Sequence, residues 1–143
     1  MRLIQQLRAF PDDALLWQHA PGITNSAGNL VLHLEGNLRD FIGRQLGGLS
    51  YVRQRDLEFS TTALSASDLI ARMEKVESSI PEAIAMLSDD QLALDYPQPV
   101  LGTTLSTRQF LIHLSGHFNY HMGQIDYLRR FLTSAGAVNF VGL

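Results

Sequence analysis

The 143-residue chain has no cysteine, only one lysine (Lys75) and no long apolar segment. The absence of cysteine excludes disulfides, thiolate zinc sites and a cysteine nucleophile. Lys and Arg together number 11 against 14 acidic residues, and they form no basic run. A nucleic-acid partner is therefore not expected, because its phosphates require a basic surface. No apolar run approaches the roughly 20 residues that cross a membrane, so no membrane partner is expected either.

The remaining composition is typical of one globular domain, taken here as residues 1–143. Apolar residues make up 45% of the chain and charged residues 17%, which argues against disorder. Polar side chains at positions 5, 6 and 8 interrupt the N-terminal segment, where a signal peptide requires an apolar stretch. We therefore expect a cytoplasmic protein.

The spacing of apolar residues predicts helices and no convincing strand. The expected helices cover residues 2–10 and 12–17 (a first helix broken at Pro11), 24 or 25 to 46, 68–87 after Ser67 as N-cap, and 107–132. Long loops follow the second and third of these helices. The pattern predicts an all-α four-helix bundle whose first helix is short or broken. That weak first helix leaves open whether a second subunit completes the core.

Histidines carry the main chemical signal: the chain contains His19, His33, His113, His117 and His121. His117 and His121 are four residues apart on a predicted helix, so their side chains can point at one ion. His113 is two turns from His121, about 12 Å along the axis, which is a long reach when metal–nitrogen bonds are about 2 Å. A third ligand is therefore expected from another helix.

His33 is the best candidate for that third ligand. At about 100° per residue it lies at the edge of its helix's apolar stripe, with Asn37 one turn further along. Facing each other in a bundle, this edge and that of His117 would line one polar pocket, to which Asn37 and Gln124 would contribute. We interpret His19 as a loop residue and His113 as an exposed or supporting residue. Purely structural histidines remain an alternative to a metal site.

Other patterns are weaker or absent. A charged cluster at Arg53, Arg55, Asp56 and Glu58 suggests either a salt-bridge network that anchors the loop or a catalytic set. The chain has no Gly-x-Ser-x-Gly motif, no phosphate-binding Gly-x4-Gly-Lys motif and no Glu-x-x-His motif. These absences disfavour a serine hydrolase, a P-loop nucleotide-binding protein and a di-iron carboxylate bundle.

Three segments together resemble the DinB-like superfamily of metal-binding four-helix bundles, in its DUF1572-like branch. Residues 117–125 (HFNYHMGQI) resemble its closing motif, residues 25–38 (NSAGNLVLHLEGNL) its second-helix motif, and residues 53–59 (RQRDLEF) its Arg-rich loop. The resemblance implies a bundle with a long crossover and a divalent metal on His33, His117 and His121. It also implies a homodimer. Characterised relatives include thiol-dependent transferases and an isomerase that use bacillithiol, mycothiol or glutathione.

Two functions follow from these observations. The first is a metal-dependent enzyme, specifically a transferase that joins a low-molecular-weight thiol to a small electrophile. The second is a non-catalytic metal-binding or interaction module, in which the ion only stabilises the bundle. Zinc and nickel are the expected ions, because imidazole ligands suit both. Because the chain lacks cysteine, a reacting sulfur would come from a cosubstrate.

Overall fold

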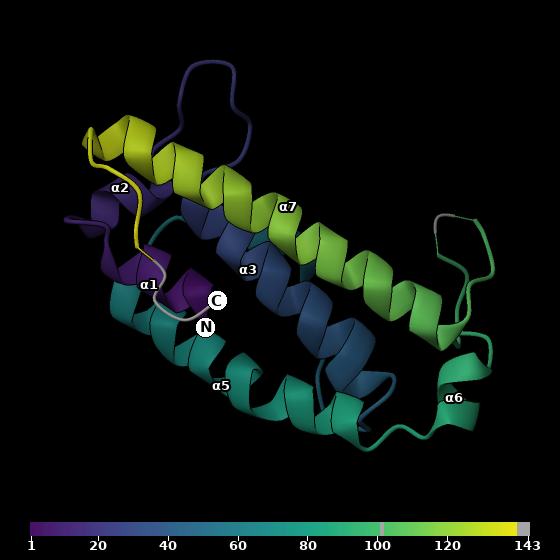
Figure 1. The fold of residues 1–143 in the computed structure, drawn as a ribbon. Coiled ribbons are helices and arrows are strands. Elements are labelled where there is room, and N and C mark those ends of the chain that lie inside the picture. The colour runs from purple at the N-terminus through teal and green to yellow at the C-terminus, as the bar shows by residue number, and fades with distance from the viewer. Residues whose placement is uncertain (101, 140–143) are drawn as a thin grey trace.

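Helices form the architecture of this computed structural model, which describes residues 1–100 and 102–139. Figure 1 shows α7 running beside α3, with α5 along the opposite side of α3. The elements are α1 (Arg2–Arg8), α2 (Asp13–Trp17), α3 (Ala27–Leu38), the π-helix η1 (Arg39–Arg44), α4 (Arg55–Ser60), α5 (Ala66–Ala85), α6 (Asp89–Ala93) and α7 (Thr107–Thr133). Within the described residues, β pairing is limited to the isolated bridges 95–106 and 100–103.

The predicted all-α four-helix bundle is confirmed. Its first helix is broken into α1, which packs against α5 and α7, and α2, which packs against α3 and α7. The second helix is α3 continued by η1, the third is α5 and the fourth is α7. None of the helices within the described residues is long and apolar enough to cross a membrane.

The structure differs from the predicted elements at caps and in loops. Ser26, and not Thr24 or Asn25, is the N-cap of α3, and Ser65, and not Ser67, is the N-cap of α5. Several neighbouring residues can accept a capping hydrogen bond, so the sequence pattern does not distinguish them. The two long loops are also not structureless, because they contain the short helices α4 and α6.

Helix α3 is buried on every side, which the predicted one-sided apolar stripe did not indicate. All residues from Ala27 to Asn37 are buried, because α4 covers the face that α5 and α7 leave open. The buried polar side chains are therefore paired. Asn29, for example, donates hydrogen bonds from its amide to the backbone oxygens of Glu58 and Thr61, at 3.1 and 3.0 Å. Polar contacts thus fix α4 against α3.

The π-helix η1 places Phe41 at the end of the bundle that carries α6. Wide π-type turns leave carbonyl groups without their usual helical partners. The Phe41 carbonyl accepts a 2.9 Å hydrogen bond from the Tyr96 hydroxyl, and burial raises the pKa of Tyr96 to about 12. The Phe41 ring meets Phe110 of α7 edge-on at 5.3 Å. These aromatic contacts fix the wall beside the histidines described below.

A close contact between α2 and α3 generates a stability prediction. A Cβ atom added at Gly28 would lie 2.6 Å from the Trp17 ring, and Trp17 is held by its hydrogen bond to the Leu64 carbonyl. We expect Gly28→Ala to lower the free energy of unfolding by about 1–3 kcal/mol, because the ring must shift. Gly123→Ala is the control, since nothing lies near its Cβ position and alanine favours helix. Equal thermal stability of both variants would contradict this packing.

Candidate metal centre

Helices α3 and α7 bring three histidines together. His33 lies on α3, and His117 and His121 lie on α7, one turn apart. Their nearest ring nitrogens all lie within 4.8 Å of one another, an arrangement that could hold a metal ion. The Nε2 atom of His117 is 3.3 Å from Nε2 of His33 and 3.1 Å from Nε2 of His121. The sequence predicted this group of three.

Two of the three separations between these nitrogens match tetrahedral coordination. With zinc–nitrogen bonds of about 2.0–2.1 Å, two ligands at a tetrahedral angle are about 3.3 Å apart. The two Nε2–Nε2 distances, 3.3 and 3.1 Å, are close to that value. Three imidazoles also leave a fourth position for water or a substrate, as catalytic zinc sites do. The donor set therefore fits a divalent ion without a carboxylate ligand.

The other ring nitrogen of His33 determines which nitrogen faces the centre. His33 Nδ1–H donates a 2.9 Å hydrogen bond to Oε2 of Glu58 on α4. That bond places the ring proton on Nδ1 and leaves the Nε2 lone pair pointing inward. Arg53 holds the Glu58 carboxylate with two hydrogen bonds, from Nε at 2.6 Å and from Nη2 at 2.8 Å. The series of hydrogen bonds from Arg53 to Glu58 and from His33 to Glu58 therefore orients the His33 ring.

Glu58 is ionised although it is buried. Burial alone would raise its pKa, but the hydrogen bonds from Arg53 and His33 outweigh that effect and lower the pKa. Gly36 makes the approach of the carboxylate possible, because a Cβ atom at that position would overlap Glu58 Oε1. Sequence reasoning missed the role of Glu58. A glycine inside a helix, Gly36, one turn from His33, was the sequence signal for a close contact. The residue that makes the contact, Glu58, is 22 positions further along the chain, so the sequence did not identify it.

Asn37 and Gln124, predicted to line the pocket, lie against two of the histidines. The Asn37 amide nitrogen is 2.9 Å from His33 Nε2 and donates to the His33 carbonyl, also at 2.9 Å. Gln124 Oε1 is 2.6 Å from His121 Nδ1, which places the His121 proton on Nδ1 and its Nε2 toward the centre. Their direct contact with a bound group stays a prediction.

Burial keeps the two α7 histidines neutral. The pKa of His117 is lowered to about 4, first by desolvation and then by repulsion from the neighbouring histidines. Desolvation also lowers the pKa of His121, with His33 adding to the effect and Gln124 opposing it. Neutral imidazole is the form that binds metals, so at neutral pH His117 and His121 need no deprotonation before they can bind an ion.

A cavity of about 550 Å³ lies directly against the centre on the side of His33 and His117, and we call it the His117 cavity. Phe41 and Phe110 form part of its wall, and Arg55 and His113 supply polar groups. His113 does not belong to the group of three but lies next to it, because the centre of its ring is 6.5 Å from that of His117. His19 is exposed in the segment that follows α2 and is not part of the group of three, as predicted for a loop residue.

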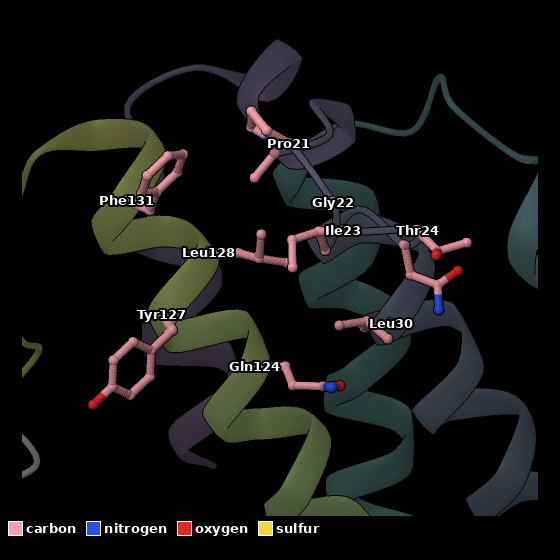
Figure 2. A pocket seen from close by; sticks show the side chains of 11 residues that line it. Pro21, Gly22, Ile23, Thr24, Leu30, Gln124, Tyr127, Leu128 and Phe131 are labelled. Atoms are coloured by element: carbon pink, nitrogen blue, oxygen red, sulfur yellow. The ribbon is translucent and has the colours of Figure 1, made fainter.

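A second cavity of about 550 Å³ lies on the other side of His121, and we call it the Gln124 cavity. Figure 2 shows Ile23 and Leu128 facing each other there, with Gln124 extending from α7 toward Leu30 of α3. The segment between α2 and α3 closes this cavity. Because Gln124 lines the cavity and contacts His121, one side chain separates the cavity from the histidine cluster.

The charged cluster lies in the crossover loop, which is the segment of residues 45–65 between η1 and α5, and it serves two purposes. Arg53 and Glu58 form the predicted salt bridge, but it supports His33 as well as anchoring the loop. Arg55 instead lines the His117 cavity, with its guanidinium 5.6 Å from the centre of the Phe59 ring. Asp56 is exposed. The structure therefore confirms the salt-bridge interpretation for Arg53 and Glu58.

The chain matches known proteins in family and in fold. A family model described as a protein of unknown function (DUF1572) matches residues 2–139. The crystal structure of a DinB-like protein from Bacillus cereus ATCC 10987 matches with a TM-score of 0.72, covering 96% of this chain and 87% of that chain at 20% identity. This likeness shows a DinB-like fold. No curated protein matches the chain.

The Glu58 contact predicts the proton position on His33. In metal-free protein we expect His33 to be the Nδ1–H tautomer, because Glu58 accepts that proton. Gly36→Ala displaces Glu58 and should return His33 to the Nε2–H form that imidazole ordinarily prefers. Long-range proton–nitrogen NMR spectra distinguish the two tautomers. Gly116→Ala, whose Cβ position is open, should leave His33 unchanged; a shared response of both variants would refute the mechanism.

Proposed function

The chain belongs to the DUF1572 family and has a DinB-like fold, and on this premise we propose that it is a divalent-metal-dependent thiol S-transferase acting on small electrophiles. In this proposal His33, His117 and His121 hold the ion. One observation carries it: three imidazoles converge on a point that also borders a cavity large enough for a small molecule. A purely structural site would be closed.

The chemistry of the ligands suggests the ion. Three uncharged nitrogen donors suit zinc or nickel, whereas magnesium, calcium and manganese favour oxygen ligands. The carboxylate that contacts the cluster, Glu58, is already bound by Arg53 and His33. Bound here, zinc or nickel would act as a Lewis acid that makes a thiol or a water more acidic at neutral pH.

The side chains of the site would hold and orient the reactants. Glu58 and Gln124 fix the rings of His33 and His121, so little reorganisation is required when the site fills. The thiol comes from a cosubstrate, because the chain has no cysteine. In the transfer, its sulfur forms a bond to carbon of the electrophile, the leaving group departs with the electron pair, and the thiol proton is released to water.

Metal content tests the ligand set. Tag-free protein should carry about one zinc or nickel ion per chain by elemental analysis, and His33→Ala and His121→Ala should lose it, since each removes one of three ligands. His113→Ala should keep the ion, because His113 lies outside the group. Absence of metal after reconstitution would overturn the proposal. A loaded protein that turns over no thiol–electrophile pair, yet loses stability on chelation, would indicate the non-catalytic module.

The support of His33 predicts an effect on metal affinity. Glu58→Gln keeps the side-chain size but removes the charge that accepts the His33 proton and pairs with Arg53. We expect it to weaken metal binding about 10–100-fold, the usual effect of losing such a partner. Asp56→Asn makes the same chemical change at an exposed position of α4 and should bind metal like the wild type. Competition titration with a chelator measures both, and identical affinities would contradict this role for Glu58.

A further inference from the structure

The two cavities beside the histidines have similar volumes but differ in charge, because Arg55 lines the His117 cavity and no charged described residue lines the Gln124 cavity. Resting on the thiol-transferase function above, we propose that they bind two different reactants. The His117 cavity takes a thiol that carries a carboxylate, which Arg55 recognises. The Gln124 cavity takes the uncharged, apolar part of the electrophile. Each cavity is about 550 Å³, within the range of small-molecule sites.

The order of residues along α7 places the histidines between the cavities. Phe110 to His117 contribute to the His117 cavity, and Gln124 to Phe131 contribute to the Gln124 cavity. His121 lies between these two stretches on the same helix. A reactant in either cavity is therefore next to the cluster: His33 and His117 line the first directly, and Gln124 connects the second to His121.

The charge of the His117 cavity favours an anion. Among the described residues that line it, Arg55 is the one permanently charged side chain and none is a carboxylate. In the part of the chain that the structure describes, no ion pair is formed by Arg55, whose contact is with the Phe59 ring. The nearby Arg53 differs, because Glu58 neutralises it. An unneutralised guanidinium at the mouth of a cavity is suited to bind a carboxylate through paired hydrogen bonds.

The Gln124 cavity favours a neutral molecule. None of the described residues that line it carries a formal charge. Ile23, Leu30 and Leu128 supply aliphatic surface, and Phe131 supplies an aromatic ring (Figure 2). The polar groups are few, which is the pattern of a site that encloses an apolar ligand and orients it by one or two hydrogen bonds. A charged group placed here would lose its hydration without gaining a partner.

The assignment predicts that two variants weaken binding of different probes. Mercaptopropionate and mercaptopropanol, which differ in the carboxylate, test the first cavity by titration calorimetry on metal-loaded protein. Arg55→Gln should weaken mercaptopropionate about tenfold and mercaptopropanol less than about twofold, since it removes a charge-assisted hydrogen bond. N-phenylnaphthylamine, a neutral fluorophore, tests the second cavity. Ile23→Gln should weaken it about fivefold through lost apolar contact.

Matched controls come from α7. Arg108→Gln makes the same charge change at an arginine that pairs with Asp89 outside both cavities. Ile112→Gln makes the same apolar-to-polar change at a side chain that is 67% exposed and lines neither cavity. Both controls should bind all three probes like the wild type. Each test position is also on the surface, so misfolding does not account for a selective loss.

Other outcomes would overturn the assignment. If Arg55→Gln weakens both thiols equally, the carboxylate is not recognised there. If Ile23→Gln leaves fluorophore binding unchanged, or either control weakens it equally, the fluorophore binds elsewhere. Repeating the fluorophore titration on His121→Ala protein separates the two proposals, because that binding requires no metal. His121→Ala protein should therefore keep fluorophore binding although it loses the metal. If the wild-type protein binds the fluorophore but holds no metal even after reconstitution, the transferase function is refuted and the apolar site is not.

Discussion

The hydrogen bond from His33 Nδ1 to Glu58 Oε2 is the interaction on which the site depends. It joins the central helix α3 to the short helix α4 and determines which nitrogen of His33 faces His117 and His121. Arg53 keeps the carboxylate ionised in a buried position, where an unpaired charge would cost several kcal/mol. Support for the centre and anchoring of the crossover loop are thus one network.

Burial of α3 on all sides explains why that network is needed. A helix with polar residues at Asn29, His33, Glu35 and Asn37 can be buried only if each finds a partner. Glu35 pairs with Arg39 and Arg72, at 2.9 and 2.6 Å, and Asn29 holds the backbone of the α4 segment. The crossover loop, through its helix α4, therefore covers the face of α3 that α5 and α7 leave open. A side chain added at Gly36 would affect the histidine site because it would displace Glu58 on α4.

The two cavities that flank the histidines differ in the charge of their walls. Toward the N-terminal half of α7, the cavity wall combines aromatic rings with Arg55 and His113. Toward its C-terminal half, the wall is uncharged and is completed by the segment between α2 and α3. The segment that leaves α2 and leads to α3 thus contributes to the site by closing one of the two cavities.

Periodicity within one helix was readable from the sequence. The i,i+4 spacing places His117 and His121 together whatever surrounds α7, and the apolar pattern predicts four helices because their spacing matches the helical repeat. Helical phase suggested His33 as the third ligand, and the DinB-like resemblance supported that choice. Glu58, Gly36 and Arg55 depended on tertiary structure, since Glu58 meets His33 across 25 positions and does so only because α4 forms inside a predicted loop. Local physics determines faces of helices, whereas contacts between distant segments determine which polar group completes a buried site.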